Sequence, residues 1–119
     1  MRAKRAYPDE RSWASQNIMI LIYSTFSDKK EAQKIGRQLV EKRLAACVNA
    51  FPIRSIYRWK GKVVEESEIA MIAKTEKRKF KEVENFILRH HSYSTPCIIA
   101  IPLGRITRKY HKWLQSNLG

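Results

Sequence analysis

The sequence predicts an α+β domain: a ferredoxin-like β-α-β-β-α-β sandwich with a long β-hairpin and an extra C-terminal helix. Three observations lead to this fold class. Short apolar runs rich in β-branched residues recur along the chain, as expected for strands buried on both faces. Two amphipathic segments with helical spacing separate these runs. A glycine turn, Lys60-Gly61-Lys62, divides the longest strand-like stretch into two arms.

The first strand and the first helix follow each other closely. Residues 18–23 form a continuous apolar run and predict a buried strand. Asp28 and Glu31 have the spacing of an N-terminal capping box. A helix is predicted from about residue 28 to 44 because apolar residues then recur at helical spacing. These residues are Ala32, Ile35, Leu39, Val40 and Leu44.

The next two strands are predicted to form one hairpin, from about residue 45 to 75. Pro52 has no N–H to donate, so the first arm is expected to be an edge strand, kinked at the proline. The apolar run 69–73 predicts a central strand for the second arm. Both arms greatly exceed the ~5–6 residues of a typical strand. The distal part, residues 53–67, is therefore expected to project beyond its own domain.

The remaining elements are a helix, a strand and a short helix. The second helix is predicted over residues 76–90, and residues 97–101 predict the last strand, which Pro102 ends. Thr107 is a candidate N-cap for the third helix. The third helix is predicted from Tyr110, Trp113 and Leu114.

The strand order follows from the connections. Right-handed crossovers place the strands in the order last, first, third, second. Cys47 and Cys97 then lie on opposite edges of the sheet, about 14 Å apart at ~4.8 Å per strand. A disulfide needs Cα atoms within about 7 Å, so both cysteines are expected to be thiols.

The apolar load of the projecting hairpin predicts an oligomer. An isolated ribbon with open edges and exposed apolar side chains is prone to aggregate. Closed threefold symmetry would let each hairpin pair with the next copy, so we expect a homotrimer. The alternative is a twisted hairpin that packs back on its own chain. The side chains concerned are Ile53, Ile56, Tyr57, Trp59, Val63 and Val64.

Length, charge and the distribution of apolar residues indicate the size of the domain, its surface and its location. The chain has 119 residues and a formal charge of +13, from 24 Lys and Arg against 11 Asp and Glu. This charge indicates either solvated basic faces or a surface for a polyanion. Residues 1–16 are polar and are expected to be a flexible extension of one domain over residues 17–119. No secretory signal or membrane-spanning run is apparent, which predicts a cytoplasmic protein without a membrane partner.

Five segments resemble the CutA family in order and spacing. The resemblance covers about residues 18 to 116. It implies a ferredoxin-like homotrimer with an intersubunit β-ribbon, linked to tolerance of divalent cations, especially copper. It also implies a likeness to PII-type signalling trimers, which bind small ligands in intersubunit clefts. The segments are residues 44–49, 55–62, 74–75, 90–96 and 110–114.

The resemblance points to a metal site, for copper or another divalent cation, that is altered in this chain. His90 and His91 match the family pattern, and imidazole binds such ions well. Ser24 stands where copper-binding members carry a cysteine, and Cys97 stands where a glutamate is common. Cys97 is expected to approach Ser24 on the adjacent strand. The alternative is that the histidines cap the end of the second helix.

Aromatic and basic residues predict a ligand cleft between subunits. A cationic, aromatic-lined cleft would favour a small anionic ligand. The alternative is that these aromatic residues form the core of the subunit interface. The cleft residues are Lys74, Tyr57, Trp59, Tyr93 and Trp113.

No nucleophile–base pair, phosphate-binding loop or HExxH motif is apparent, so the chain is not expected to be an enzyme. An RNA-binding domain shares the element order, but it needs aromatic residues on the two central strands. Those strands are nearly all aliphatic here, so nucleic acid is not an expected partner. The remaining alternative is a PII-like trimer that binds a small anion in signalling.

Overall fold

The computed structural model describes residues 18–119, so the predicted extension at residues 1–16 lies outside the described residues. Every predicted element is present in the predicted order. A short 3-10 turn, Lys77–Lys79, precedes the second long helix. The elements are β1 (Met19–Phe26), α2 (Lys29–Glu41), β2 (Cys47–Trp59), β3 (Lys62–Glu76), α3 (Phe80–His90), β4 (Ile98–Pro102) and α4 (Arg108–Ser116).

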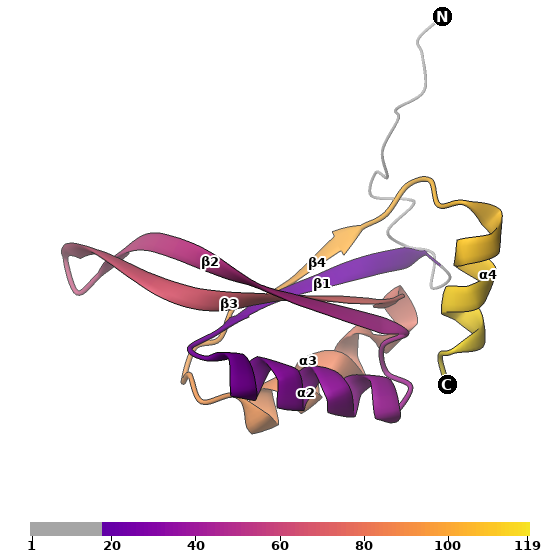
Figure 1. The fold of residues 1–119 in the computed structure, drawn as a ribbon, viewed down its shortest axis with the longest axis horizontal. Coiled ribbons are helices and arrows are strands. Elements are labelled where there is room, and N and C mark those ends of the chain that lie inside the picture. Colours follow the sequence, from indigo (N-terminus) through magenta and orange to yellow (C-terminus); the bar gives the residue numbers. More distant parts are fainter. Residues whose placement is uncertain (1–17) are drawn as a thin grey trace, which may run out of the picture.

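The four strands form one antiparallel sheet in the order β2-β3-β1-β4. This is the predicted order, read from the other edge. Helices α2 and α3 lie together on one face of the sheet, and α4 lies beyond one end of it (Figure 1). Cys47 begins one edge strand and Cys97 directly precedes the other, and both cysteines are free, as expected.

The main core lies between the sheet and the helices α2 and α3. Side chains of β1 and β3 that point toward the helices meet the apolar stripes of both helices. The fully buried members include Ile20, Ile22, Phe26, Ile35, Leu39, Met71, Val83 and Ile87. A second, smaller cluster around Met19, Ala46 and Leu114 holds α4 against the end of the sheet.

The N-terminal cap of α2 is only half a capping box. The Glu31 amide donates to Asp28 Oδ1 at 2.8 Å, as predicted. The Glu31 carboxylate does not return to Asp28, because it accepts two hydrogen bonds from Ser92. The helix ends at Glu41, earlier than predicted, where Arg43 adopts a φ of +59°. Thr107 does occupy the N-cap of α4, but its side chain makes no capping hydrogen bond.

The hairpin of β2 and β3 pairs without a break from Cys47 opposite Lys74 to Trp59 opposite Lys62. Pro52 lies on the edge strand, as predicted, and the register continues through it. Lys60 and Gly61 both have positive φ, the geometry of a tight two-residue hairpin turn. The distal half extends away from α2 and α3 and does not fold back on them (Figure 1).

Part of the sheet face opposite α2 and α3, along β4 and β1, is apolar. Ile98 and Ala100 pack on the core, so the alternating residues Ile99 and Ile101 point to the opposite face. Ile99 is 51% exposed and Ile101 is 44% exposed. Tyr23 lies opposite Ile99 in register and shares this face. A single chain thus leaves an apolar sheet surface uncovered, in addition to the hairpin.

The close contact between α2 and β2 gives a test of the packing. Alanine normally stabilises a helix relative to glycine by about 1 kcal/mol. A Cβ at Gly36 would lie 2.8 Å from Val48 Cγ1, a stiff β-branched side chain. We therefore predict that Gly36→Ala lowers the free energy of unfolding by about 1–3 kcal/mol in chemical denaturation. The Gly36→Ala/Val48→Ala double variant should regain part of this stability, because the smaller side chain at position 48 removes the clash. A loss in the double variant equal to the sum of the two single losses would contradict the close contact between α2 and β2.

Candidate functional site

The five residues predicted to line one cleft fall into two groups in a single chain. Tyr57, Trp59 and Tyr93 line one pocket of about 410 Å³. Lys74 and Trp113 lie instead with Tyr110 in a separate group. We call the first site the acidic pocket. It is lined by Thr25, Tyr57, Trp59, Glu66, Glu68, Tyr93, Ser94, Thr95 and Cys97.

Strand alternation places the aromatic and acidic side chains of the hairpin on one face. Glu66 and Glu68 are two residues apart on β3, and Tyr57 and Trp59 are two apart on β2. Glu66 lies opposite Ser55, which shares a face with Tyr57. The hairpin therefore supplies two carboxylates and two aromatic rings to the acidic pocket.

Phenol hydroxyls hold both carboxylates. Tyr57 Oη donates to Glu66 Oε1, and this bond raises the pKa of Tyr57. Tyr93 Oη donates to Glu68 Oε2 at 2.7 Å. Burial, and then this bond, raise the pKa of Tyr93. Burial, and then the charge of Glu68, raise the pKa of Cys97, so the protonated thiol is favoured in the acidic pocket.

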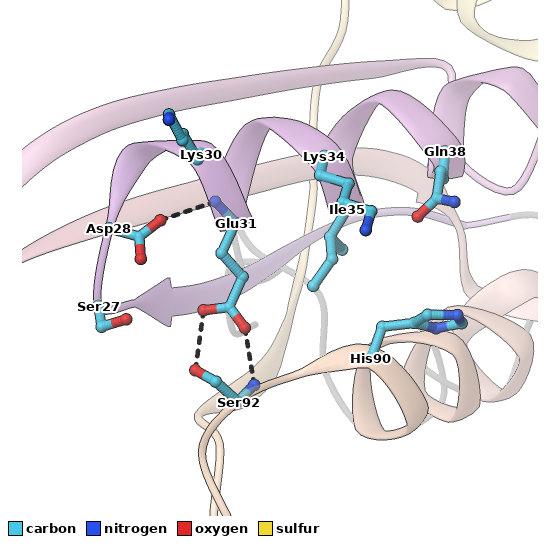
Figure 2. A pocket seen from close by; sticks show the side chains of 9 residues that line it. All are labelled: Ser27, Asp28, Lys30, Glu31, Lys34, Ile35, Gln38, His90 and Ser92. Carbon is cyan, nitrogen blue, oxygen red and sulfur yellow. Dashed lines mark hydrogen bonds between the residues drawn. The ribbon is translucent and has the colours of Figure 1, made fainter.

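His91 positions the loop that carries Tyr93. Its Nε2 donates to the Thr25 carbonyl at 2.8 Å, so Nδ1 must accept the Tyr93 amide at 3.0 Å. The ring also stacks on Phe26, with the centroids 4.5 Å apart. Ser92 ties the same loop to Glu31 on α2 (Figure 2). Both ring nitrogens of His91 are thus engaged in structural hydrogen bonds.

His90 lies elsewhere, at the C-terminal end of α3. Its Nδ1 bonds the Phe86 carbonyl at 2.8 Å and its ring stacks on Phe86, as the helix-end alternative expects. The Nε2 atom then remains an acceptor. Figure 2 shows His90 facing α2 across a pocket of about 390 Å³. This pocket is lined by Ser27, Asp28, Lys30, Glu31, Lys34, Ile35, Gln38, His90 and Ser92.

The four predicted metal ligands do not meet at one point within a chain. Ser24 lies opposite Ile98 on the helix-covered face, and its Oγ is buried without a hydrogen-bond partner. Cys97 lines the acidic pocket with Thr25, the strand neighbour of Ser24, which points to the other face. The sheet therefore separates Cys97 from Ser24. Within residues 18–119, no group of three or more His, Cys, Asp or Glu side chains is arranged to hold a metal ion.

The second group is cationic. Lys74 Nζ donates to Tyr110 Oη at 2.9 Å and lies 5.2 Å from the centre of the same ring. The bond to Tyr110 raises the pKa of Lys74. Tyr110 stacks on Trp113, which is 47% exposed. This group keeps the cationic, aromatic character predicted for the whole cleft.

Sequence reasoning missed the two pocket carboxylates. Glu65 and Glu66 are adjacent near the hairpin turn, where nearby Lys and Arg residues make ion pairing the simplest expectation. Glu65 does bond Arg54, at 3.0 Å, whereas Glu66 takes the Tyr57 hydroxyl on the other side of the hairpin. The period-two spacing of Glu66 and Glu68, shared with Tyr57 and Trp59, is the signal that could have found them.

The two histidines should differ in their effect on stability. His91→Ala removes two hydrogen bonds and leaves the Tyr93 amide without its acceptor, so we predict a loss of about 1–3 kcal/mol in the free energy of unfolding. His90→Ala removes one bond from an exposed ring and should cost clearly less. Chemical denaturation of both variants measures this. Equal losses would contradict the positioning role of His91.

Comparison with known proteins agrees with this fold. A family model described as the CutA1 divalent ion tolerance protein matches residues 20–117. The divalent-cation tolerance protein CutA of Thermotoga maritima is 45% identical over 100 residues, covering 84% of this chain and 99% of that protein. The CutA of Archaeoglobus fulgidus is 45% identical over 97 residues, covering 82% of this chain and 95% of that protein.

Solved structures give the same result. The structure of the Archaeoglobus fulgidus protein, described as the periplasmic divalent cation tolerance protein CutA, has a TM-score of 0.83 at 43% identity. It covers 86% of this chain and 100% of that one. Because sequence and structure agree over most of the chain, the chain belongs to the CutA1 family of divalent ion tolerance proteins.

Proposed function

We propose that this protein is a homotrimer of ferredoxin-like subunits that takes part in the tolerance of divalent cations. Membership of the CutA1 family carries this proposal. The relatives reported above are named for cation tolerance and not for a reaction, which supports a non-enzymatic role. These names lend no support to an RNA-binding or a PII-like signalling function.

Two uncovered apolar surfaces support the assembly. The distal hairpin exposes Ile56 by 66%, Trp59 by 57% and Val63 by 64%. The sheet face opposite α2 and α3 exposes Ile99 and Ile101. An interface between copies would remove this apolar surface from water.

We further propose that a divalent cation such as copper binds between subunits. His90 Nε2 and the Cys97 thiol are the candidate donors whose atoms are not committed to hydrogen bonds within one chain. His91 would then position the loop between His90 and Cys97 without binding the ion, and Ser24 would not be a ligand. A site shared between copies would supply the third ligand that one chain does not provide within residues 18–119.

Two further proposals concern a small anionic ligand and the location of the protein in the cell. The Lys74, Tyr110 and Trp113 group suits a small anion at a subunit cleft. Among residues 18–119, no helix has the length and hydropathy needed to cross a membrane. We propose a cytoplasmic location, although the Archaeoglobus fulgidus relative is described as periplasmic.

Two exposed apolar residues test the assembly face. Ile99 on the open sheet face and Leu88 on α3 are 51% and 52% exposed in one chain. We predict that Ile99→Glu dissociates the trimer because it places a charge in the interface, whereas Leu88→Glu leaves it intact. Light scattering should give three times the 14.0 kDa chain mass for the wild type. The same assembly state for both variants would argue against this interface.

Copper titration tests the metal site. We expect His90→Ala and Cys97→Ser each to weaken copper affinity by at least about tenfold, because each removes a donor atom. His111→Ala serves as the control, because His111 is a histidine that is not among the proposed copper ligands. Calorimetry of all variants measures the affinities. Unchanged copper binding in both ligand variants would refute the proposed donors.

A further inference from the structure

We propose that the acidic pocket of one copy receives the end of the neighbouring copy's hairpin, so that Glu66 and Glu68 pair with lysines of a second chain. This inference rests on the proposed homotrimer and names the charged contact that fixes how its copies meet. It uses none of the donor atoms proposed for copper. We call the three cations around the hairpin turn the basic tip: Arg58, Lys60 and Lys62.

The acidic pocket lacks a counter-charge within its own chain. No lysine or arginine lines it, and the ion pairs among residues 18–119 include neither Glu66 nor Glu68. Glu68 is only 9% exposed even in a single chain. An interface over the distal hairpin would bury both carboxylates further, and a buried carboxylate without a counter-charge costs free energy. The copy that covers this pocket is therefore expected to bring a cation to it.

The acidic pocket adjoins the surface that the proposed assembly covers. Thr25, which lines the pocket, is two residues from Tyr23 on β1 and points to the same face of the sheet. Tyr23 lies opposite Ile99 in register, on the open sheet face. A copy that covers the exposed side chain of Ile99 therefore also lies beside the acidic pocket.

The basic tip has the complementary charge. Residues 58–64 contain three cations and no carboxylate. The ion pairs within the described part of the chain leave Lys60 and Lys62 without a carboxylate partner. Lys60 Nζ lies 6.0 Å from the centre of the Trp59 ring, a contact that keeps the ammonium N–H donors available. The tip thus offers the charge that the pocket lacks.

The basic tip is badly placed to fill the pocket of its own chain. Lys62 and Glu66 share the open face of β3, but four residues separate them along the strand. At about 3.3 Å per residue this separation is about 13 Å. The tip also projects away from the helices and from the rest of the sheet (Figure 1). A projecting tip is instead placed to reach a second copy.

Other cations of the chain are poorer partners for the pocket. Lys74 also belongs to the open face, but it lies near the base of the hairpin, opposite Cys47, and donates to Tyr110 on α4. The cations of α2 and α3 belong to the layer on the opposite side of the sheet (Figure 1). The basic tip is therefore the cationic group that extends beyond its own domain.

This contact explains how a ring of three copies would close. Tip and pocket are different parts of the chain, so the contact is head-to-tail, and threefold closure uses each tip and each pocket once. Apolar surfaces exclude water, whereas paired charges fix the register of two partners and disfavour wrong arrangements. The charged contact therefore selects one arrangement of the apolar surfaces.

Charge reversal tests the pairing. Glu66→Lys/Glu68→Lys gives the pocket the sign of the tip, and Lys60→Glu/Lys62→Glu gives the tip the sign of the pocket. Light scattering over a dilution series should show that each double variant weakens assembly at least about a hundredfold, because like charges then meet across the interface. The quadruple variant, which carries both reversals in one chain, restores opposite charges at every contact and should regain the trimer.

Glu82→Lys/Glu84→Lys is the control, because it makes the same change of charge on α3, in the layer opposite the proposed interface. It should leave the trimer intact. Circular dichroism identifies a reversal variant that does not fold. The neutral variants Glu66→Gln/Glu68→Gln and Lys60→Gln/Lys62→Gln then take its place, and each should weaken assembly at least about tenfold.

Four results would overturn the pairing. Unchanged assembly of a folded pocket or tip variant, a quadruple variant that stays dissociated, or equal dissociation of the control would overturn it and leave the proposed homotrimer standing. A wild-type protein with the mass of one chain would overturn the pairing and the homotrimer together. The two proposals can therefore be told apart by the wild-type mass.

Discussion

The structure depends on one constraint: the pairing of β2 and β3 continues well beyond the helices that cover the sheet. The register is unbroken from Cys47 to Trp59, and only Lys60 and Gly61 connect the two paired strands. Backbone hydrogen bonds can extend a hairpin in this way, but they cannot bury its side chains. The apolar residues of the distal half therefore need a surface that their own chain does not supply.

The same hairpin builds the acidic pocket. Its period-two alternation sends Tyr57, Trp59, Glu66 and Glu68 to one side, and the loop after α3 closes the pocket with Tyr93. This loop keeps its position because His91 bonds the end of β1 and Ser92 bonds the start of α2. The hairpin that we propose for assembly thus also forms one wall of this pocket, and the residues between the histidines and Cys97 join the helical layer to the hairpin.

Much of the fold was predictable because it follows from local periodicity. The apolar run of β1, the helical spacing in α2 and the glycine turn each indicate one structure, and crossover handedness then sets the strand order. Pro52 correctly marked an edge strand. The helix cap was half predicted, because the Glu31 carboxylate prefers Ser92, a residue distant in sequence.

The site was less predictable because its contacts are long-range. The sequence grouped aromatic residues with Lys74, but register places Lys74 opposite Cys47, at the far end of the hairpin from Tyr57. The adjacent histidines suggested one shared metal site. In the structure, however, the His91 ring bonds the Thr25 carbonyl and the His90 ring bonds the Phe86 carbonyl. Side-chain direction in a loop depends on the partners that the fold supplies, and local spacing does not encode it.

Amide hydrogen exchange across residues 53–67 of the wild-type chain tests the central claim most directly. If neighbouring copies cover the projecting hairpin, these amides should exchange about as slowly as those where β1 pairs with β3, and dilution that separates the copies should accelerate them. Fast exchange throughout the distal hairpin, at concentrations where β1 and β3 remain protected, would show a ribbon open to water and would contradict the account.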